Sequence, residues 1–204
     1  MPQTAILILA AGASSRMGGQ DKLMMDIDGT PLLARVISRA QATGHPVFVT
    51  LPHKEHPRAG LVRNAGATAV IVADWADGMS ASVRHGIAAL PKHLNGAMIL
   101  PADMPDLTVK DLNTLLQAFE RKPDSITRAA THSAIPGNPV IFPAEFFDAL
   151  QNLTGDQGAR GVIRAQEHRL HLVPLPGNHA RTDLDTLRDW ARWRAEQTTK
   201  GDPD

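Results

Sequence analysis

The stretch that most strongly constrains the fold is LAAGASSRMGGQDK, residues 9–22. It continues from a run of mostly aliphatic residues, Thr4 to Leu9, which is typical of a strand buried on both faces of a parallel sheet. Pro31 then opens a helix with apolar residues at helical spacing, and Gly44 closes it. The first unit is therefore a strand, a long loop and a helix. Strand-to-helix turns usually take about two to six residues, so this loop's length indicates a function.

Strands and helices alternate along the rest of the chain. Further strands are expected at 47–51, 69–73, 97–100, 140–142 and 170–173, and further helices at 58–64, 79–90, 144–150, 159–168 and 186–197. Thr108 and Asp111 resemble a capping box that opens another helix. The alternation predicts an α/β fold with a mostly parallel sheet and helices on both faces. For 204 residues we expect one domain over 1–198 and a flexible tail over 199–204.

Composition excludes several classes of function. Lys and Arg together number 21, as do Asp and Glu, so no overall positive field would hold a nucleic acid. There is no cysteine, which excludes disulfides, thiolate zinc sites and cysteine nucleophiles and agrees with a reducing cytoplasm. The apolar start at 5–11 lacks a preceding basic region and is too short to span a bilayer. We therefore expect a cytoplasmic protein that binds neither nucleic acid nor membrane.

The long loop has the composition of an anion-binding segment. Its small residues, Gly12 among them, let backbone N–H groups approach phosphate oxygens, and Arg16 and Lys22 add positive charge. Its spacing is that of neither the P-loop nor the G-x-G-x-x-G fingerprint. An NAD-binding module is therefore set aside.

Three carboxylates are candidates for a metal site. Asp103 follows a central strand, at the sheet edge where open α/β sheets bind ligands. Asp183 and Asp185 would share one side of an extended segment. The alternative for this pair is a purely structural one, since both could cap the last helix.

Other candidates are less clearly separated from structural roles. Ser80 and Ser82 are candidate binding residues, unless Ser80 is a helix cap. Arg160 would bind a phosphate group or form a surface ion pair. The pairs His53 with His56 and His168 with His171 lack a third ligand, so we interpret them as surface histidines.

Six motifs taken together resemble those of the MobA-like nucleotidyltransferases. They are LAAGASSRMGGQDK at 9–22, GMSASVRHG at 78–86, PADMP at 101–105, GNPV at 137–140, GDQGAR at 155–160 and TDLDT at 182–186. In the first motif Gln20 and Asp21 fill the variable gap before Lys22, which is one residue longer than the shortest spacing. The form with two alanines, Ala10 and Ala11, looks most like molybdenum cofactor cytidylyltransferases.

The resemblance implies a fold of the nucleotide-diphospho-sugar transferase type and a Mg²⁺-dependent reaction. CMP would pass from CTP to the terminal phosphate of molybdopterin, with release of pyrophosphate, and the product would go to a molybdoenzyme. The implied roles are nucleotide binding by Leu9, Ala10, Ala11, Gly12, Arg16, Lys22, Ser80, Ser82 and Asp103, acceptor binding by Asn138 and Arg160, and metal binding by Asp103 with Asp185, or less favourably Asp183. Arg16, Lys22 and Asp103 would be the catalytic residues. Guanylyl transfer, transfer to a sugar phosphate, and a non-catalytic cofactor carrier remain as alternatives.

Overall fold

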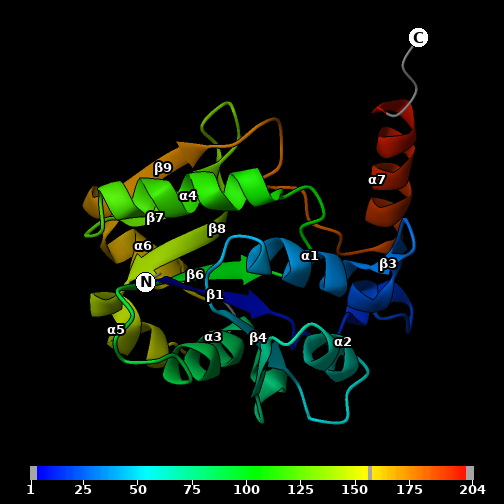
Figure 1. Cartoon of the computed structure of the whole chain (residues 1–204), viewed down its shortest axis with the longest axis horizontal. Coiled ribbons are helices and arrows are strands. Elements are labelled where there is room, and N and C mark those ends of the chain that lie inside the picture. The colour runs from blue at the N-terminus through cyan, green and yellow to red at the C-terminus, as the bar shows by residue number, and fades with distance from the viewer. Residues whose placement is uncertain (1–3, 156–157, 201–204) are drawn as a thin grey trace.

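A seven-stranded sheet crosses the middle of the protein in this computed structural model, which describes residues 4–155 and 158–200 (Figure 1). The strand order is β5-β4-β1-β6-β8-β7-β9. Their bounds are β1 (Thr4–Leu9), β4 (Val47–Leu51), β5 (Thr68–Ile71), β6 (Gly96–Pro101), β7 (Ile126–Ala130), β8 (Pro136–Pro143) and β9 (Leu170–Pro174). Neighbouring strands pair in parallel except at β8, which is antiparallel to β6 and β7. The predicted α/β fold is confirmed.

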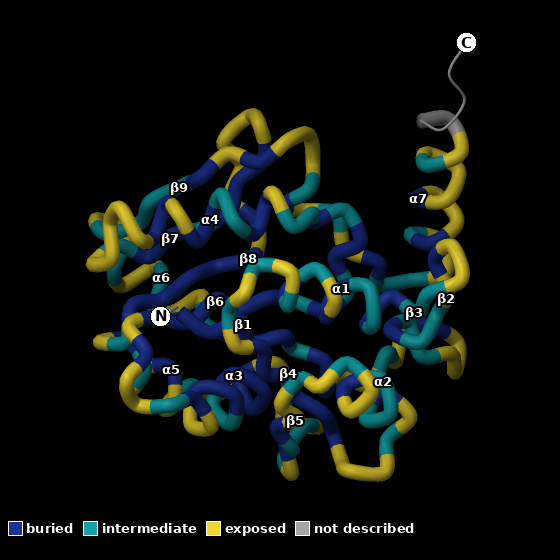
Figure 2. Tube along the Cα trace, viewed as in Figure 1, coloured by how far each residue is buried: buried dark blue, intermediate teal, exposed yellow. Residues whose placement is uncertain are grey.

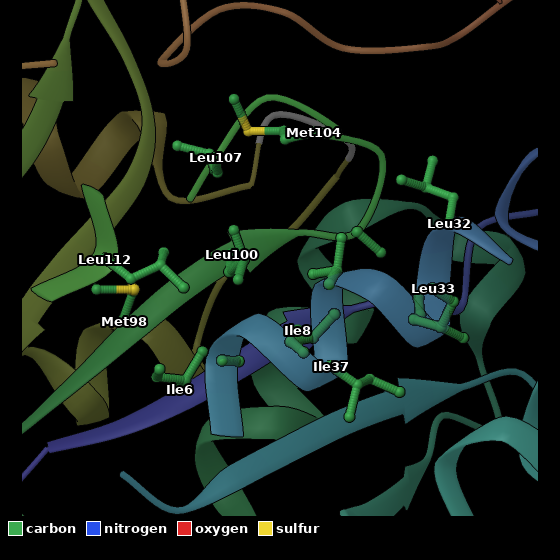
Figure 3. Close-up of a cluster of buried hydrophobic side chains, with 14 of the residues drawn as sticks. Ile6, Ile8, Leu32, Leu33, Ile37, Met98, Leu100, Met104, Leu107 and Leu112 are labelled. Atoms are coloured by element: carbon green, nitrogen blue, oxygen red, sulfur yellow. The ribbon is translucent and has the colours of Figure 1, made fainter. Parts of the chain in front are cut away.

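Helices cover both faces of this sheet. One face carries α1 (Leu32–Gln41), α2 (Arg58–Asn64) and α4 (Val109–Arg121), and the other carries α3 (Met79–Ala88), α5 (Phe147–Gln151) and α6 (Arg160–Ala165). Helix α7 (Leu187–Lys200) lies to one side of the sheet and adds Trp190 and Trp193 to the core of the first face (Figure 1). Alternation along β1 divides the core between the two faces, because Ile6 and Ile8 pack with α1 and α4 (Figure 3) while Ala5 and Leu7 pack with α3. The central strands are consequently buried along almost their whole length (Figure 2).

Short elements shape the loops around the sheet. They are β2 (Asp26–Ile27), β3 (Thr30–Pro31), η1 (Ser15–Met17), η2 (Lys22–Met24), η3 (Trp75–Asp77), η4 (Ala144–Phe146) and η5 (Glu167–Arg169). The predicted capping box is confirmed, since the Asp111 N–H donates to Thr108 Oγ1 at 3.1 Å and the Thr108 N–H donates to Asp111 Oδ2 at 2.9 Å.

Most predicted elements are present with altered ends. Helix α3 ends at Ala88 and not at Leu90, since Pro91 disfavours helical backbone in the residue before it. The first helix stops at Gln41, and Gly44 closes the turn that follows, with φ of 78°. Strand β5 is shorter than expected, and the helix predicted at 159–168 is two pieces, α6 and η5.

Two features of the second half differ more. Strand β7 was not predicted, and β8 begins at Pro136, four residues before the expected strand. Of the predicted tail, 201–204 lie outside the described residues, and α7 runs to Lys200. In the part of the chain that the structure describes, none of the helices combines the length and apolar character needed to cross a bilayer.

Candidate nucleotide-binding site

An open cleft of about 780 Å³ lies at the carboxyl ends of β1 and β6. Such an edge is the usual ligand site of an open α/β sheet. The predicted residues that line the cleft are Leu9, Ala11, Gly12, Arg16, Lys22, Ser82, Asp103, Asn138, Arg160, Asp183 and Asp185. The cleft therefore brings together residues from both halves of the chain.

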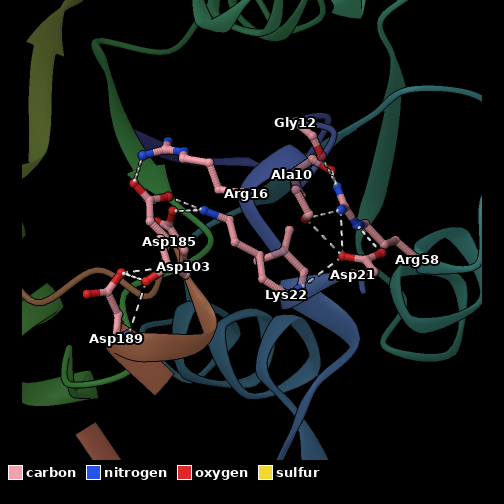
Figure 4. Close-up of polar contacts among 12 residues, drawn as sticks. Ala10, Gly12, Arg16, Asp21, Lys22, Arg58, Asp103, Asp185 and Asp189 are labelled. Carbon is pink, nitrogen blue, oxygen red and sulfur yellow. Dashed lines mark hydrogen bonds and ion pairs between the residues drawn. The ribbon is translucent and has the colours of Figure 1, made fainter. Parts of the chain in front are cut away.

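A buried arginine that was not predicted fixes the backbone of the long loop. Arg58 is 1% exposed, and its Nη1 donates to the carbonyls of Ala10 at 2.6 Å and Gly12 at 2.8 Å. Its Nε and Nη2 donate to the two carboxylate oxygens of Asp21 at 2.8 and 2.5 Å (Figure 4). Arg58 thus joins the start of the loop to its end.

The same contact determines the charge on Asp21. Burial alone would raise the pKa of Asp21, but the hydrogen bonds and charge of Arg58 outweigh it and hold the pKa below its ordinary value. Asp21 Oδ1 also accepts from the Leu23 N–H at 3.0 Å, which caps η2. Lys22, the first residue of η2, is positioned by this cap.

Lys22 lies between two of the predicted carboxylates. Its Nζ donates to Asp103 Oδ2 at 2.5 Å and to Asp185 Oδ1 at 2.7 Å (Figure 4). Burial would lower the pKa of Lys22, but the two carboxylates outweigh it and raise the pKa. Arg16 forms an ion pair with the other oxygen of Asp185 at 2.9 Å. Two acids and two cations therefore meet at one point.

The structural alternative for Asp183 and Asp185 is wrong. The cap of α7 is Thr186, whose Oγ1 accepts from the Asp189 N–H at 3.2 Å, and Asp189 Oδ2 accepts from the Thr186 N–H at 2.9 Å. Asp185 points instead to Lys22 and Arg16. Burial, followed by the like charges of Asp103 and Asp185, raises the pKa of Asp183.

A backbone hydrogen bond holds the two acidic segments together. The Leu184 N–H donates to the carbonyl of Asp103 at 3.0 Å, and Leu184 is buried in the core. The carboxylates on either side of Leu184 are thereby kept beside the turn that follows β6.

The family model for the MobA-like NTP transferase domain matches residues 6–170. The chain belongs to this family. It is 26% identical to nicotine blue oxidoreductase of Paenarthrobacter nicotinovorans over 94% of this chain and 97% of that protein. It is 33% identical to a molybdenum cofactor guanylyltransferase of Pseudomonas aeruginosa, over 60% of each chain.

Solved structures share the fold over almost the whole chain. Rv0371c of Mycobacterium tuberculosis H37Rv superposes with a TM-score of 0.77 at 25% identity, covering 94% of this chain and 97% of that one, and its manganese complex has also been solved. A CMP:2-keto-3-deoxy-manno-octonic acid synthetase in complex with CTP has a TM-score of 0.75 at 15% identity, covering 97% and 99%. The latter likeness shows the fold alone.

Two predicted site residues of this MobA-like domain do not line the cleft. Ala10 is buried, its N–H donating to Thr50 Oγ1 at 3.0 Å and its carbonyl accepting from Arg58. Ser80 is buried at the start of α3, where its hydroxyl donates to the Thr154 carbonyl at 3.4 Å. It makes no side-chain cap hydrogen bond in α3, so its predicted capping role is also wrong. Ser82, by contrast, faces the cleft.

Close backbone packing shapes the part of the cleft around Asn138. The Asn138 N–H donates to the Ala180 carbonyl at 2.8 Å. A Cβ on Gly137 would lie 2.0 Å from that carbonyl oxygen, so only glycine permits this approach. Strand β8 and the loop before Asp183 are thus in direct contact. Asp156 and Gln157 of the GDQGAR motif lie outside the described residues.

Several residues that line the cleft were not predicted from the sequence. They include Trp75, Arg128 and Arg181. None belongs to a quoted motif, and an arginine in a short strand such as β7 has no distinguishing signal. The histidine pairs lie away from the cleft lining, and no group of three or more His, Cys, Asp or Glu side chains within residues 4–155 and 158–200 is arranged to hold a metal by itself.

Proposed function

We propose that this chain is a Mg²⁺-dependent nucleotidyltransferase that passes CMP from CTP to the terminal phosphate of the molybdenum cofactor and releases pyrophosphate. The observation that carries the proposal is the convergence of Asp103 and Asp185 on Lys22 of the phosphate-binding loop. Membership of the NTP transferase family supports the reaction class. A molybdoenzyme would then receive the product.

The acidic residues suit a divalent cation that binds together with the nucleotide. Asp103 and Asp185 already aim oxygens at one positive group, the Lys22 ammonium. Two carboxylates are too few to enclose an ion, but Mg²⁺ is commonly held by one or two carboxylates plus substrate phosphates and water. When bound, the ion neutralises phosphate charge and polarises the reacting phosphorus centre. The manganese complex of Rv0371c supports a divalent ion in this fold.

The chain's own cations would position the triphosphate. Release of Lys22 and Arg16 from the carboxylates would free both for phosphate oxygens, and the loop N–H groups near Gly12 would add fixed dipoles. Because a phosphate monoester is already ionised near neutral pH, the attacking oxygen needs no general base. The residues therefore act by alignment and by electrostatic stabilisation of the leaving pyrophosphate.

The choice of CTP rests on the loop's second alanine. Ala11 is 1% exposed and packs with Val72 and Ala81 at the wall of the cleft. Its methyl group leaves less room for a ring than glycine would, which favours a pyrimidine. Guanylyl transfer is the competing specificity, because curated relatives carry that name.

A second candidate is an oxidoreductase built on the same fold. One observation favours it: the relative named nicotine blue oxidoreductase matches nearly the whole chain. The carboxylate pair around Lys22 has an evident use in phosphate transfer, so nucleotidyl transfer stays first.

A panel of donors and acceptors tests the proposal. Purified protein with Mg²⁺ and molybdenum cofactor should release pyrophosphate with CTP well ahead of GTP, ATP and UTP. Preference for GTP would indicate a guanylyltransferase instead of a cytidylyltransferase. Turnover of UTP with a sugar phosphate would indicate that the acceptor is a sugar phosphate and not the molybdenum cofactor. Tight cofactor binding without pyrophosphate release would favour a carrier. Redox turnover of nicotine blue with an added electron donor, again without pyrophosphate, would favour the oxidoreductase.

A further inference from the structure

Three arginines from separate elements gather on the wall of the cleft. Arg128 lies on β7, Arg160 begins α6, and Arg181 lies in the loop between β9 and α7. These positions are widely separated in the sequence, and the fold brings all three to one cavity.

The backbone around β8 holds two of these side chains. Arg128 Nε donates to the Gly137 carbonyl at 2.8 Å, and Arg181 Nη1 donates to the Pro136 carbonyl at 3.3 Å. Each of these hydrogen bonds uses one nitrogen of a guanidinium that has five N–H donors, so donors remain for a ligand. Arg160 and Arg181 are exposed to the cleft, and Arg128 is half-buried.

The arrangement concentrates positive charge. Within the described residues none of the three arginines has a carboxylate within ion-pair distance, whereas Arg16 and Lys22 are both paired with acids. Burial, followed by the charges of Arg160 and Arg181, lowers the pKa of Arg128. The three positive charges repel one another, so a bound anion would reduce the electrostatic repulsion that is present in the free protein.

From this geometry we infer that Arg128, Arg160 and Arg181 form an anion subsite that binds the phosphate of the acceptor. Guanidinium groups match phosphate with two parallel N–H donors each. The subsite is distinct from the nucleotide loop, because its residues come from β7, α6 and the β9–α7 loop. It rests on the proposed function for the identity of the ligand, but anion binding itself does not depend on turnover.

Inorganic phosphate is the probe for the subsite. In metal-free protein Lys22 and Arg16 are occupied by Asp103 and Asp185, so free phosphate should select the unpaired arginines. Titration calorimetry should show phosphate binding to the wild type. The double variant Arg160→Met with Arg181→Met should weaken it roughly tenfold or more, as expected for lost charge-assisted hydrogen bonds.

Arg63→Met is the matched control, since Arg63 is an exposed arginine on α2 outside the cleft lining. It should bind phosphate as the wild type does. Arg160→Lys with Arg181→Lys should restore part of the affinity, because charge returns without the bidentate geometry. Equal phosphate affinity in the wild type and the double methionine variant would overturn the inference.

Steady-state kinetics provide a second test of the subsite, with any acceptor that the protein turns over. The double methionine variant should raise KM for the acceptor roughly tenfold and leave KM for the nucleotide unchanged. A parallel rise in both constants would contradict a subsite specific to the acceptor. Phosphate binding that depends on the arginines, in a protein that releases no pyrophosphate, would support the subsite and refute the proposed function.

Discussion

Arg58 and Asp21 form a two-point ion pair that closes the long loop at 9–22, with Nε–Oδ2 and Nη2–Oδ1 distances of 2.8 and 2.5 Å. The side chain of Arg58 is 2% exposed and that of Asp21 is 23% exposed. Arg58 also donates to the carbonyls of Ala10 and Gly12. Neither Arg58 nor Asp21 lines the cleft, so the pair acts through the loop residues that it holds in place, Gly12 and Lys22 among them.

Arg58→Met should therefore damage stability and activity together. It leaves Asp21 and two loop carbonyls without their donor, and an unsatisfied, partly buried acceptor costs about 1–3 kcal/mol. Urea unfolding should show this loss, and KM for the nucleotide should rise. Arg63→Met on the same helix should change neither quantity; an unfolding free energy for Arg58→Met equal to the wild type would contradict the positioning role.

The same pair predicts a pH dependence of stability. The pKa of Asp21 is lowered in the folded protein, so its ionised form stabilises the fold at pH above the ordinary aspartate pKa, and this contribution disappears as the pH falls through the lowered value. Asp21→Asn should thus be less stable than the wild type at neutral pH. The gap should narrow in acid, as measured by urea unfolding across the pH range. A gap that stays constant would exclude ionisation of Asp21 as its source.

Lys22→Met should impair use of the nucleotide. Removing a charge-assisted contact to phosphate should lower kcat/KM for CTP about 10- to 100-fold. The acceptor's KM should change little, since Lys22 and the three-arginine subsite come from different elements. Normal turnover by this variant would mean that the loop only connects β1 to α1 and does not bind the nucleotide through Lys22.

The two acids before α7 should differ in importance. Asp185 contacts both Lys22 and Arg16, whereas Asp183 forms no ion pair with any residue that the structure describes. Asp185→Asn should therefore cost activity severely and Asp183→Asn mildly, when pyrophosphate release is followed at saturating Mg²⁺. Equal losses would mean that the two carboxylates act as a unit.

Gly137→Ala should loosen the part of the cleft around Asn138. The added Cβ meets the Ala180 carbonyl oxygen at 2.0 Å, so the loop that carries Arg181 has to shift. We expect a stability loss of about 1–3 kcal/mol and a higher KM for the acceptor. Gly60→Ala in α2 meets nothing within 4 Å and is the control; identical behaviour of the two variants would show that the close approach is unimportant.

Local patterns predicted the regular parts of this protein well. Strand β1, strand β4 and helix α2 match their predicted bounds, because aliphatic runs and helical spacing are local signals. Strand β7 was missed because ITRAA is short and carries a central arginine. The start of β8 was missed because residues 136–139 are proline, glycine, asparagine and proline, which are typical of a turn.

The site was predictable where a motif carried it and not where contacts are distant in sequence. Asp103, Asp185 and Lys22 were identified from motifs, and the fold brings them together. Arg58 was not identified, because its contact with Asp21 spans 37 positions and no local spacing marks it. Asp21 itself appeared only as a residue in a variable gap. Arg128 and Arg181 were missed for the same reason, since only the tertiary structure places them beside Arg160.

Pyrophosphate release by the wild type and by Asp103→Asn, measured with CTP, Mg²⁺ and molybdenum cofactor, tests the central claim most directly. The wild type should release pyrophosphate, and the variant should fall at least about 100-fold in kcat/KM because a carboxylate that would hold the ion is gone. Its melting temperature should stay close to the wild type, since Asp103 lines the cleft and lies outside the core. Equal rates for the two proteins, or no pyrophosphate from the wild type with any of the four nucleotides, would contradict the account.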